Sequence, residues 1–233
     1  MQLAIVHHAA SAAAISALFC APPGDLYAHA EETPTARPAI ERARELGPDA
    51  DATLLALPGE PSQAGQIVIT EFMKDPSTVS DARGEWIEVY NAMPWRVNLE
   101  GWVLSDDSGA QHVIHAASGA LRLGPGQYVV LGNNADPALN GGVQIDYTWT
   151  SFSLGNGADQ IILSKGDGTL VDRVAYDDGV LWPDTAGRAI ALRNTARTAV
   201  LNDDPTNWCH ASSPIGPTNT DTGTPHFDND ACP

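Results

Sequence analysis

Residues 84–106 read GEWIEVYNAMPWRVNLEGWVLSD, and their apolar side chains alternate with polar ones as they do along β-strands. The turn at 91–96 separates two such runs, and Gly101 interrupts the second, where a glycine indicates a bend or a bulge. Side chains on one face of these strands should form the core. The residues that we predict for this core are Ile87, Val89, Leu99, Trp102 and Leu104.

The same pattern extends from about residue 67 to residue 192. Short runs rich in β-branched and aromatic residues, such as QIVITEFM (66–73), QYVVLG (127–132) and DQIILSK (159–165), are separated by turn residues roughly every ten positions. Many short strands with frequent turns are typical of a β-sandwich or a β-barrel. We therefore predict an all-β fold.

The chain has 233 residues, enough for one domain with flanking segments. Lys and Arg total 12 against 29 Asp and Glu, which gives a formal net charge of -17 at pH 7. Such a surface repels phosphate backbones, so nucleic acid is not expected as a partner. A local basic patch would be the exception, and it would have to form from Arg188, Arg193 and Arg197.

The first thirty residues have the pattern of a secretory signal peptide. An apolar run at 9–19 is followed by an A-x-A cleavage site at 28–30, and the run is too short to span a bilayer. We predict a signal peptide at 1–30, an exported protein (secreted, periplasmic or on the cell surface) and no transmembrane segment in the mature chain. Lipid anchoring through Cys20 is the alternative, which the bulky Phe19 before it disfavours.

The flanking segments differ from the strand-rich region. Residues 31–65 are rich in proline, alanine and charge without a sustained apolar period, so we predict a linker there. Residues 209–233 form a C-terminal tail, and the two cysteines that remain after signal removal are Cys209 and Cys232. In an exported chain such a pair favours a disulfide over an incomplete zinc shell, with two free thiols as the remaining alternative.

The order of these pieces resembles the lamin tail domain family. Glu71 is followed by GEWIEVYN, VNLEGWVLSD, LRLGPGQYVVL, SFSLGNGADQIILSKGDGTLVDRVAY and NWC, and the resemblance covers roughly residues 66–208. It implies an immunoglobulin-like β-sandwich in which Trp102 lies on a core strand. The chain departs from nuclear lamins because it has no heptad rod and is strongly acidic. The tail is instead similar to that of exported bacterial relatives in the pattern of Trp208, Cys209, Asn229 and Cys232.

Motifs of common enzyme classes are missing from the sequence. It contains no G-x-S-x-G, no H-E-x-x-H and no G-x-x-x-x-G-K-[ST]. His112 and His115 are three apart on an expected strand, which points them to opposite faces rather than at one ion. We therefore predict no catalytic residues. The predicted function is an exported non-catalytic structural or interaction module that binds a protein or a cell-envelope polymer; the alternative is an accessory subunit of a secreted hydrolase or nuclease.

Aromatic side chains that the core pattern does not require are candidates for ligand contact at the surface. These candidates are Trp95, Tyr147, Trp149 and Trp182. The alternative is that they cover the sheet edges, since scattered aromatic residues are normal at protein surfaces.

Acidic pairs are the remaining chemical feature, at 106–107, 177–178 and 203–204, with Asp228 and Asp230 in the tail. Carboxylate oxygens suit calcium, but the sequence has no D-x-[DN]-x-[DN]-G spacing, and aspartates in turns commonly bind backbone groups. We expect no cofactor and no metal site, with calcium as the weaker alternative.

Overall fold

The structure is a computed structural model, and it describes residue 65 and residues 67–233. The predicted signal peptide at 1–30 and all but Gly65 of the predicted linker lie outside the described residues. The strands are β1 (Ile67–Met73), β2 (Trp86–Asn91), β3 (Val97–Asn98), β4 (Val103–Ser105), β5 (Gln111–Val113), β6 (Arg122–Leu123), β7 (Tyr128–Gly132), β8 (Tyr147–Thr148), β9 (Asp159–Ser164), β10 (Leu170–Tyr176), β11 (Ile190–Leu192), β12 (Trp208–His210), β13 (Pro214–Gly216) and β14 (Asn219–Thr222). The helical segments are α3 (Asp81–Gly84), η1 (Asn194–Ala196) and η2 (Pro205–Asn207).

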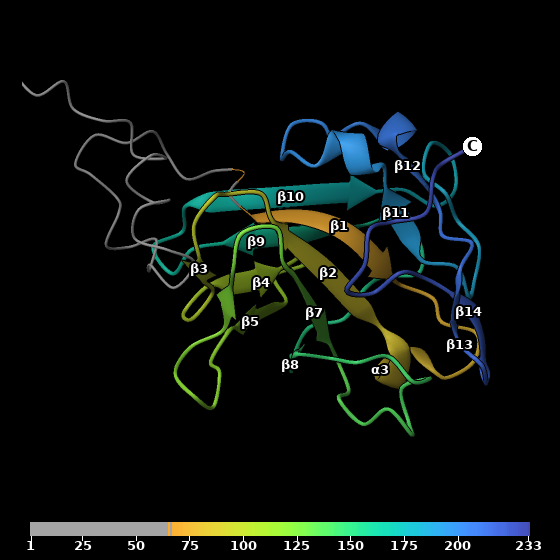
Figure 1. Cartoon of the computed structure of the whole chain (residues 1–233), viewed down its shortest axis with the longest axis horizontal. Helices are drawn as coiled ribbons and strands as arrows, with labels where there is room; N and C mark the ends of the chain where they lie inside the picture. The colour runs from red at the N-terminus through yellow and green to blue at the C-terminus, as the bar shows by residue number, and fades with distance from the viewer. Residues whose placement is uncertain (1–64, 66) are drawn as a thin grey trace, which may run out of the picture. The chain divides into compact units, whose positions relative to one another are not determined.

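Two sheets face each other across one core (Figure 1). The larger sheet has the strand order β12-β11-β1-β2-β7-β8, and the smaller sheet has the order β10-β9-β4-β5. Strand β8 runs parallel to β7, whereas β1, β2 and β7 pair antiparallel. Two short ladders, β3-β6 and β13-β14, lie outside these sheets. The arrangement confirms the predicted all-β, immunoglobulin-like sandwich.

Large apolar side chains from both sheets fill the core. Strand β2 contributes Ile87 and Val89, and β4 contributes Leu104. Leu99 and Trp102 are buried in the same cluster, so the structure places all five side chains predicted for the core inside it. Each large apolar side chain removed from water contributes about 2 kcal/mol, which makes this cluster the main source of stability.

A β-bulge in β1 changes which side chains face the core. The pairing of β1 with β2 shifts between Ile69 and Glu71, so Thr70 is the extra residue. Ile69 lies in the core, and beyond the bulge Phe72 lies there instead of Glu71. Because side chains alternate along a strand, one inserted residue reverses the faces that follow it. Glu71 therefore lies on the outer face of the larger sheet.

Side chains from distant segments bind backbone groups of β1 beside the bulge. Asp172 Oδ2 accepts the N–H of Ile69 at 2.6 Å, and Asn202 Nδ2 donates to the same carboxylate oxygen at 2.7 Å. Asn229 Nδ2 donates to Thr70 O at 2.8 Å. A buried backbone polar group without a partner is costly, so these contacts stabilise the irregular strand.

The C-terminal tail covers the outer face of the larger sheet, and Figure 1 shows it crossing β1 and β2 in dark blue. Ile215 of β13 packs there against a second apolar cluster. This cluster consists of Met73, Trp86, Val130, Val143, Ala189, Ala191 and Ala211. Both faces of the larger sheet are therefore buried, one by the smaller sheet and one by the tail.

A disulfide closes the tail into a loop. Cys209 in β12 is bonded to Cys232, 23 residues further along the chain, with an S–S distance of 2.07 Å. This bond confirms the predicted pairing. In the described part of the chain, no helix is long and apolar enough to cross a membrane.

Replacing Cys209 and Cys232 together by serine should lower the free energy of unfolding by about 3 kcal/mol, because the unfolded chain gains the freedom of an open loop. Urea unfolding of the oxidised protein and of the double variant measures this difference. Equal unfolding midpoints at equal slopes would show that the disulfide does not constrain the tail.

Candidate functional site

Two of the four aromatic residues predicted for surface contact are buried. Trp149 is 2% exposed and packs edge-on against Phe152, with ring centroids 5.4 Å apart. Trp182 is 6% exposed, and its ring centroid lies 5.3 Å from that of Trp208. The prediction of a surface position is wrong for both, because the segments that carry these residues direct the indole rings into the core. Turn composition shows where a chain bends but not which side chain points inward.

The other two aromatic candidates, Trp95 and Tyr147, are half-buried. Trp95 packs against the main core. Tyr147, the first residue of β8, also touches the core and lines a surface hollow of about 500 Å³. Other residues that line this hollow include His115, Ser118, Leu121, Asp146 and Thr148. Of the four candidates, Tyr147 is the one that lines this hollow, which we call the Tyr147 hollow.

Two histidines contact the Tyr147 hydroxyl. His112 Nε2 lies 2.7 Å from Tyr147 Oη, and the backbone N–H of His115 donates to the same oxygen at 2.9 Å. The His115 imidazole has a different partner, because its Nδ1 lies 3.0 Å from Glu100 Oε1. Desolvation lowers the pKa of His112, which favours the neutral ring at pH 7. The phenol is therefore held by hydrogen bonds on a fixed backbone segment.

The Tyr147 hollow is lined by both apolar and polar groups. It combines an aromatic ring, the partly exposed Asp146 carboxylate and small hydroxyl side chains with Leu121 and four alanines. Binding sites commonly combine apolar contact area with a few fixed polar groups of this kind. The two imidazole rings have separate partners, Tyr147 for His112 and Glu100 for His115, and do not converge on one point. What alternation along the strand did not predict is that Tyr147, 32 residues beyond His115, contacts both residues.

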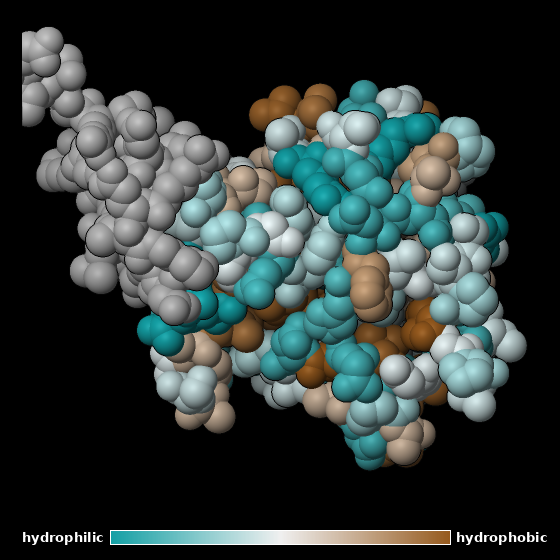
Figure 2. Space-filling view, viewed as in Figure 1, coloured by the Kyte–Doolittle hydropathy of each residue, from teal (hydrophilic) through white to brown (hydrophobic). Residues whose placement is uncertain are grey.

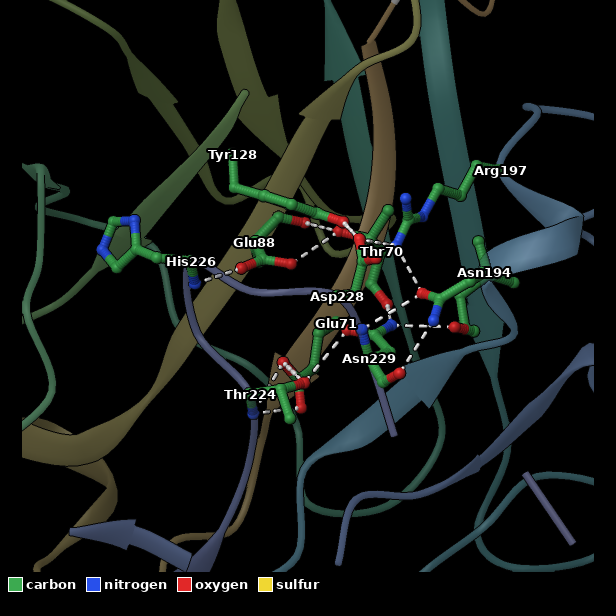
Figure 3. A network of polar contacts seen from close by, with 11 residues as sticks. Thr70, Glu71, Glu88, Tyr128, Asn194, Arg197, Thr224, His226, Asp228 and Asn229 are labelled. Atoms are coloured by element: carbon green, nitrogen blue, oxygen red, sulfur yellow. Dashed lines mark hydrogen bonds and ion pairs between the residues drawn. The ribbon is translucent and has the colours of Figure 1, made fainter. Parts of the chain in front are cut away.

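A second polar group of side chains lies between the larger sheet and the tail (Figure 3). Glu71 and Glu88 are cross-strand partners in β1 and β2, and both are 0% exposed. The N–H of Thr224 donates to Glu71 Oε1 at 3.0 Å. Glu88 Oε2 accepts the N–H of His226 at 2.6 Å, and Glu88 Oε1 lies 2.9 Å from Thr70 Oγ1. Two buried acids therefore bind the backbone of the tail.

Arg197 and two tyrosines form the rim of this network. The guanidinium of Arg197 lies over the rings of Tyr90 and Tyr128, at 4.7 and 5.3 Å from their centroids. Its Nη2 is 2.7 Å from Asp228 Oδ1, and the Tyr128 hydroxyl donates to the same oxygen at 2.7 Å. Hydrogen bonds from Tyr128 and Arg197 lower the pKa of Asp228. Arg197 is thus bound to the tail rather than free to form a basic patch.

Burial is the main reason that the pKa values of the two glutamates are raised. It raises the pKa of Glu71 well above its ordinary value, and the neighbouring Glu88 raises it further. Burial also raises the pKa of Glu88 to about 8, against the opposing effect of its hydrogen bonds from His226 and Thr70. The sequence analysis did not predict that Glu71 and Glu88 form a buried pair. Alternation with Ile87 and Val89 puts Glu88 on the outer face, but no local signal shows that the tail covers it.

Two of the aspartates considered for calcium, Asp106 and Asp177, bind backbone groups in turns. Asp106 Oδ1 accepts the N–H groups of Ser108 and Ala110, at 2.8 and 3.0 Å. Asp177 binds three successive N–H groups in the same way, those of residues 180–182. Within the residues that the structure describes, no group of three or more His, Cys, Asp or Glu side chains could hold a metal ion. These contacts assign the acids a role in fixing turns.

Replacing Trp182 by alanine should lower the free energy of unfolding by about 3 kcal/mol or more, because it leaves a cavity against Trp208. The matched control is Val180→Ala in the same turn, where the side chain is 80% exposed and the cost should be below about 0.5 kcal/mol. Urea unfolding of both variants compares them. Equal stability would mean that Trp182 is not part of the core.

The raised pKa values predict that stability falls as pH rises. A group that is more easily protonated when folded stabilises the protein fully below its unfolded pKa, and the gain is lost as pH passes its folded pKa. For Glu88 this window runs from about 4.5 to about 8, and the loss is on the order of a few kcal/mol. The lowered pKa of Asp228 acts oppositely, since its contribution is lost in acid below about 3.8.

Urea unfolding across this range should therefore show a maximum in weakly acidic buffer, and Glu88→Gln should flatten the decline on the alkaline side. Stability that increases from about pH 5 to about pH 8 would contradict the assignment of neutral buried acids.

Comparison with known proteins agrees with the architecture. The chain matches the family model described as Lamin Tail Domain over residues 60–178, just over half of its 233 residues. No curated protein matches the chain. The matched region contains β1 to β10, and hence both faces of the main core and the whole Tyr147 hollow. A domain of this family is immunoglobulin-like and usually a non-catalytic interaction module. The chain belongs to the lamin tail domain family.

Proposed function

We propose that this protein is an exported, non-catalytic interaction module that binds another protein or a cell-envelope polymer through the Tyr147 hollow. The observation that carries the proposal is the geometry of Tyr147, whose hydroxyl is held by His112 and by the backbone of His115 at the edge of a hollow of about 500 Å³.

Rigidity supports this assignment. Tyr147 belongs to β8, which pairs with β7 through Leu131, and its ring packs against the main core. A tyrosine that is already fixed loses little conformational freedom when a ligand binds, so its contact area contributes more fully to affinity. The partly exposed Asp146 beside it offers a hydrogen-bond acceptor to the same ligand.

Two further features support export and a partner other than nucleic acid. The Cys209–Cys232 disulfide suits an oxidising compartment, where such bonds persist. The net charge of -17 opposes phosphate-rich partners. Figure 2 shows a largely hydrophilic surface over the region where β11, β12 and the tail lie in Figure 1. That face suits exposure to water, and we assign ligand contact to the hollow.

The test is co-sedimentation of the purified protein with envelope fractions of the producing cell. Tyr147→Ala should weaken binding by about tenfold or more, as expected for loss of a central aromatic contact. Tyr147→Phe should bind better than Tyr147→Ala because it keeps the ring. The matched control is Leu181→Ala, which removes a large apolar side chain that is 71% exposed in the turn after β10, outside both the hollow and the tail.

Unfolding curves recorded for each variant confirm that the proteins compared are folded. Wild-type protein that stays wholly in the supernatant would argue against an envelope ligand and for a released partner of another secreted chain. Equal sedimentation of wild type and Tyr147→Ala would remove the hollow as the binding site.

A further inference from the structure

The hydroxyl of Thr224 has one proton but lies between two acceptor side chains. Thr224 Oγ1 is 3.0 Å from Glu71 Oε2 and 3.1 Å from Asn229 Oδ1. The amide of Asn229 is fixed in orientation, because its Nδ2 donates to both Thr70 O and Leu192 O at 2.8 Å. Asn229 Oδ1 must therefore accept, and the Thr224 hydroxyl is the donor that the structure places on it.

The contact between Thr224 and Glu71 then needs a proton from the glutamate. If Thr224 donates to Asn229, two oxygens meet at 3.0 Å, and only a protonated Glu71 Oε2 makes this contact a hydrogen bond. The N–H of Thr224 lies 3.0 Å from Oε1 and 3.1 Å from Oε2, so Oε1 can accept it while Oε2 carries the proton. The geometry thus assigns Glu71 as a neutral carboxylic acid that both donates to and accepts from one tail residue.

We propose that residues 224–229 form a latch that closes on protonated Glu71, opens when Glu71 loses its proton to solvent, and thereby regulates the Tyr147 hollow. The disulfide limits the opening, because Cys209 and Cys232 hold the tail on both sides of the latch. The regulatory part rests on the function proposed for the hollow, whereas the latch itself does not.

A continuous set of contacts links the latch to the hollow. His226 in the latch donates its N–H to Glu88, and its Nε2 lies 3.0 Å from Gln144 O and 3.6 Å from Asp146 Oδ2. Asp146 lines the hollow directly before Tyr147. When the latch opens, His226 moves away from Gln144 and Asp146, and the Asp146 side chain becomes more mobile. An open latch should therefore weaken binding at the hollow.

The charges around Glu71 favour its protonated state, whereas the pKa of Glu88 is raised by burial against the opposing effect of Arg197. Glu71 faces Glu88 in β2 and Asp230 in the tail, and both oppose a second negative charge. Glu88 faces the cation Arg197, the carboxylate of Asp146 and the backbone of His226. Arg197 is the one cation in this set, and it is paired with Asp228.

The sign of the pH effect follows from these surroundings. A raised pKa means that the closed latch is stable below the ordinary glutamate value and weakens as pH rises past the folded value of Glu71. Ionised Glu71 would place a buried charge beside Glu88, and the Thr224 hydroxyl could no longer serve both Glu71 and Asn229.

Amide hydrogen exchange at Thr224, corrected for the intrinsic exchange rate at each pH, tests the latch without any ligand. In the wild type, protection should fall by about tenfold or more as the pH rises past the folded pKa of Glu71, which lies well above the ordinary glutamate value of 4.5. In Glu71→Gln the Thr224 amide should stay protected as pH rises. The glutamine oxygen can accept the Thr224 N–H, and the glutamine NH2 group can donate to the Thr224 hydroxyl.

The matched control is Glu85→Gln. Glu85 is also buried and its pKa is raised to about 7, but it binds Leu154 and Asn133 rather than the tail. This variant should show the wild-type fall in protection at Thr224. Protection in the wild type that does not change with pH, or tail protection lost at every pH in Glu71→Gln, would overturn the latch.

Envelope sedimentation separates the latch from the function of the hollow. Wild-type binding should weaken over the same pH range, and Glu71→Gln should retain it. If exchange changes with pH while Tyr147-dependent binding does not, regulation of the hollow is refuted and its binding function stands. If Tyr147→Ala sediments like the wild type, the binding function is refuted and exchange still decides the latch.

Discussion

The bulge at Thr70 is the constraint on which the outer half of the structure depends. Without the extra residue, the alternation that puts Ile69 in the core would put Glu71 there as well. With it, Phe72 enters the core and Glu71 lies on the outer face opposite Glu88. One inserted residue thus protects the sandwich core from a carboxyl group and places that group where the tail can bind it.

The tail makes the larger sheet a layer between two cores. An antiparallel sheet of a sandwich commonly faces water on one side, but here Trp86 and Val130 meet Ala211 and the tail on that side. The polar contacts of Thr224 and His226 lie beside this apolar cluster. Ala211 and Ile215 attach the tail by hydrophobic contact, and the buried acids make the attachment sensitive to protons.

How far sequence reasoning succeeded depends on whether the signal is local. Alternation predicted the inward side chains of β2 correctly, because Ile87 and Val89 are two residues apart on one strand. The disulfide was predictable because only two cysteines remain after removal of the predicted signal peptide, and an exported chain favours their pairing. Trp149 and Trp182 were assigned to the surface because loop residues carry no periodicity that reports burial.

The sites depend on contacts that are distant in sequence. Glu71 and Thr224 are 153 positions apart, and the bulge that brings them together has no glycine or proline to mark it. Tyr147 was a candidate by residue type, but its partners His112 and His115 reach it only through the fold. Family membership similarly predicts the sandwich, while the latch involves tail residues beyond the matched region.

The latch requires that Glu71 is neutral in the folded protein, and the ¹³C chemical shift of its side-chain carboxyl carbon measures its protonation. We predict that the ¹³C chemical shift of Glu71 keeps the value of a protonated acid through neutral pH, with Glu88 beside it titrating at about 8. A shift for Glu71 that titrates near the ordinary glutamate value of 4.5 would show an ionised acid and contradict the account.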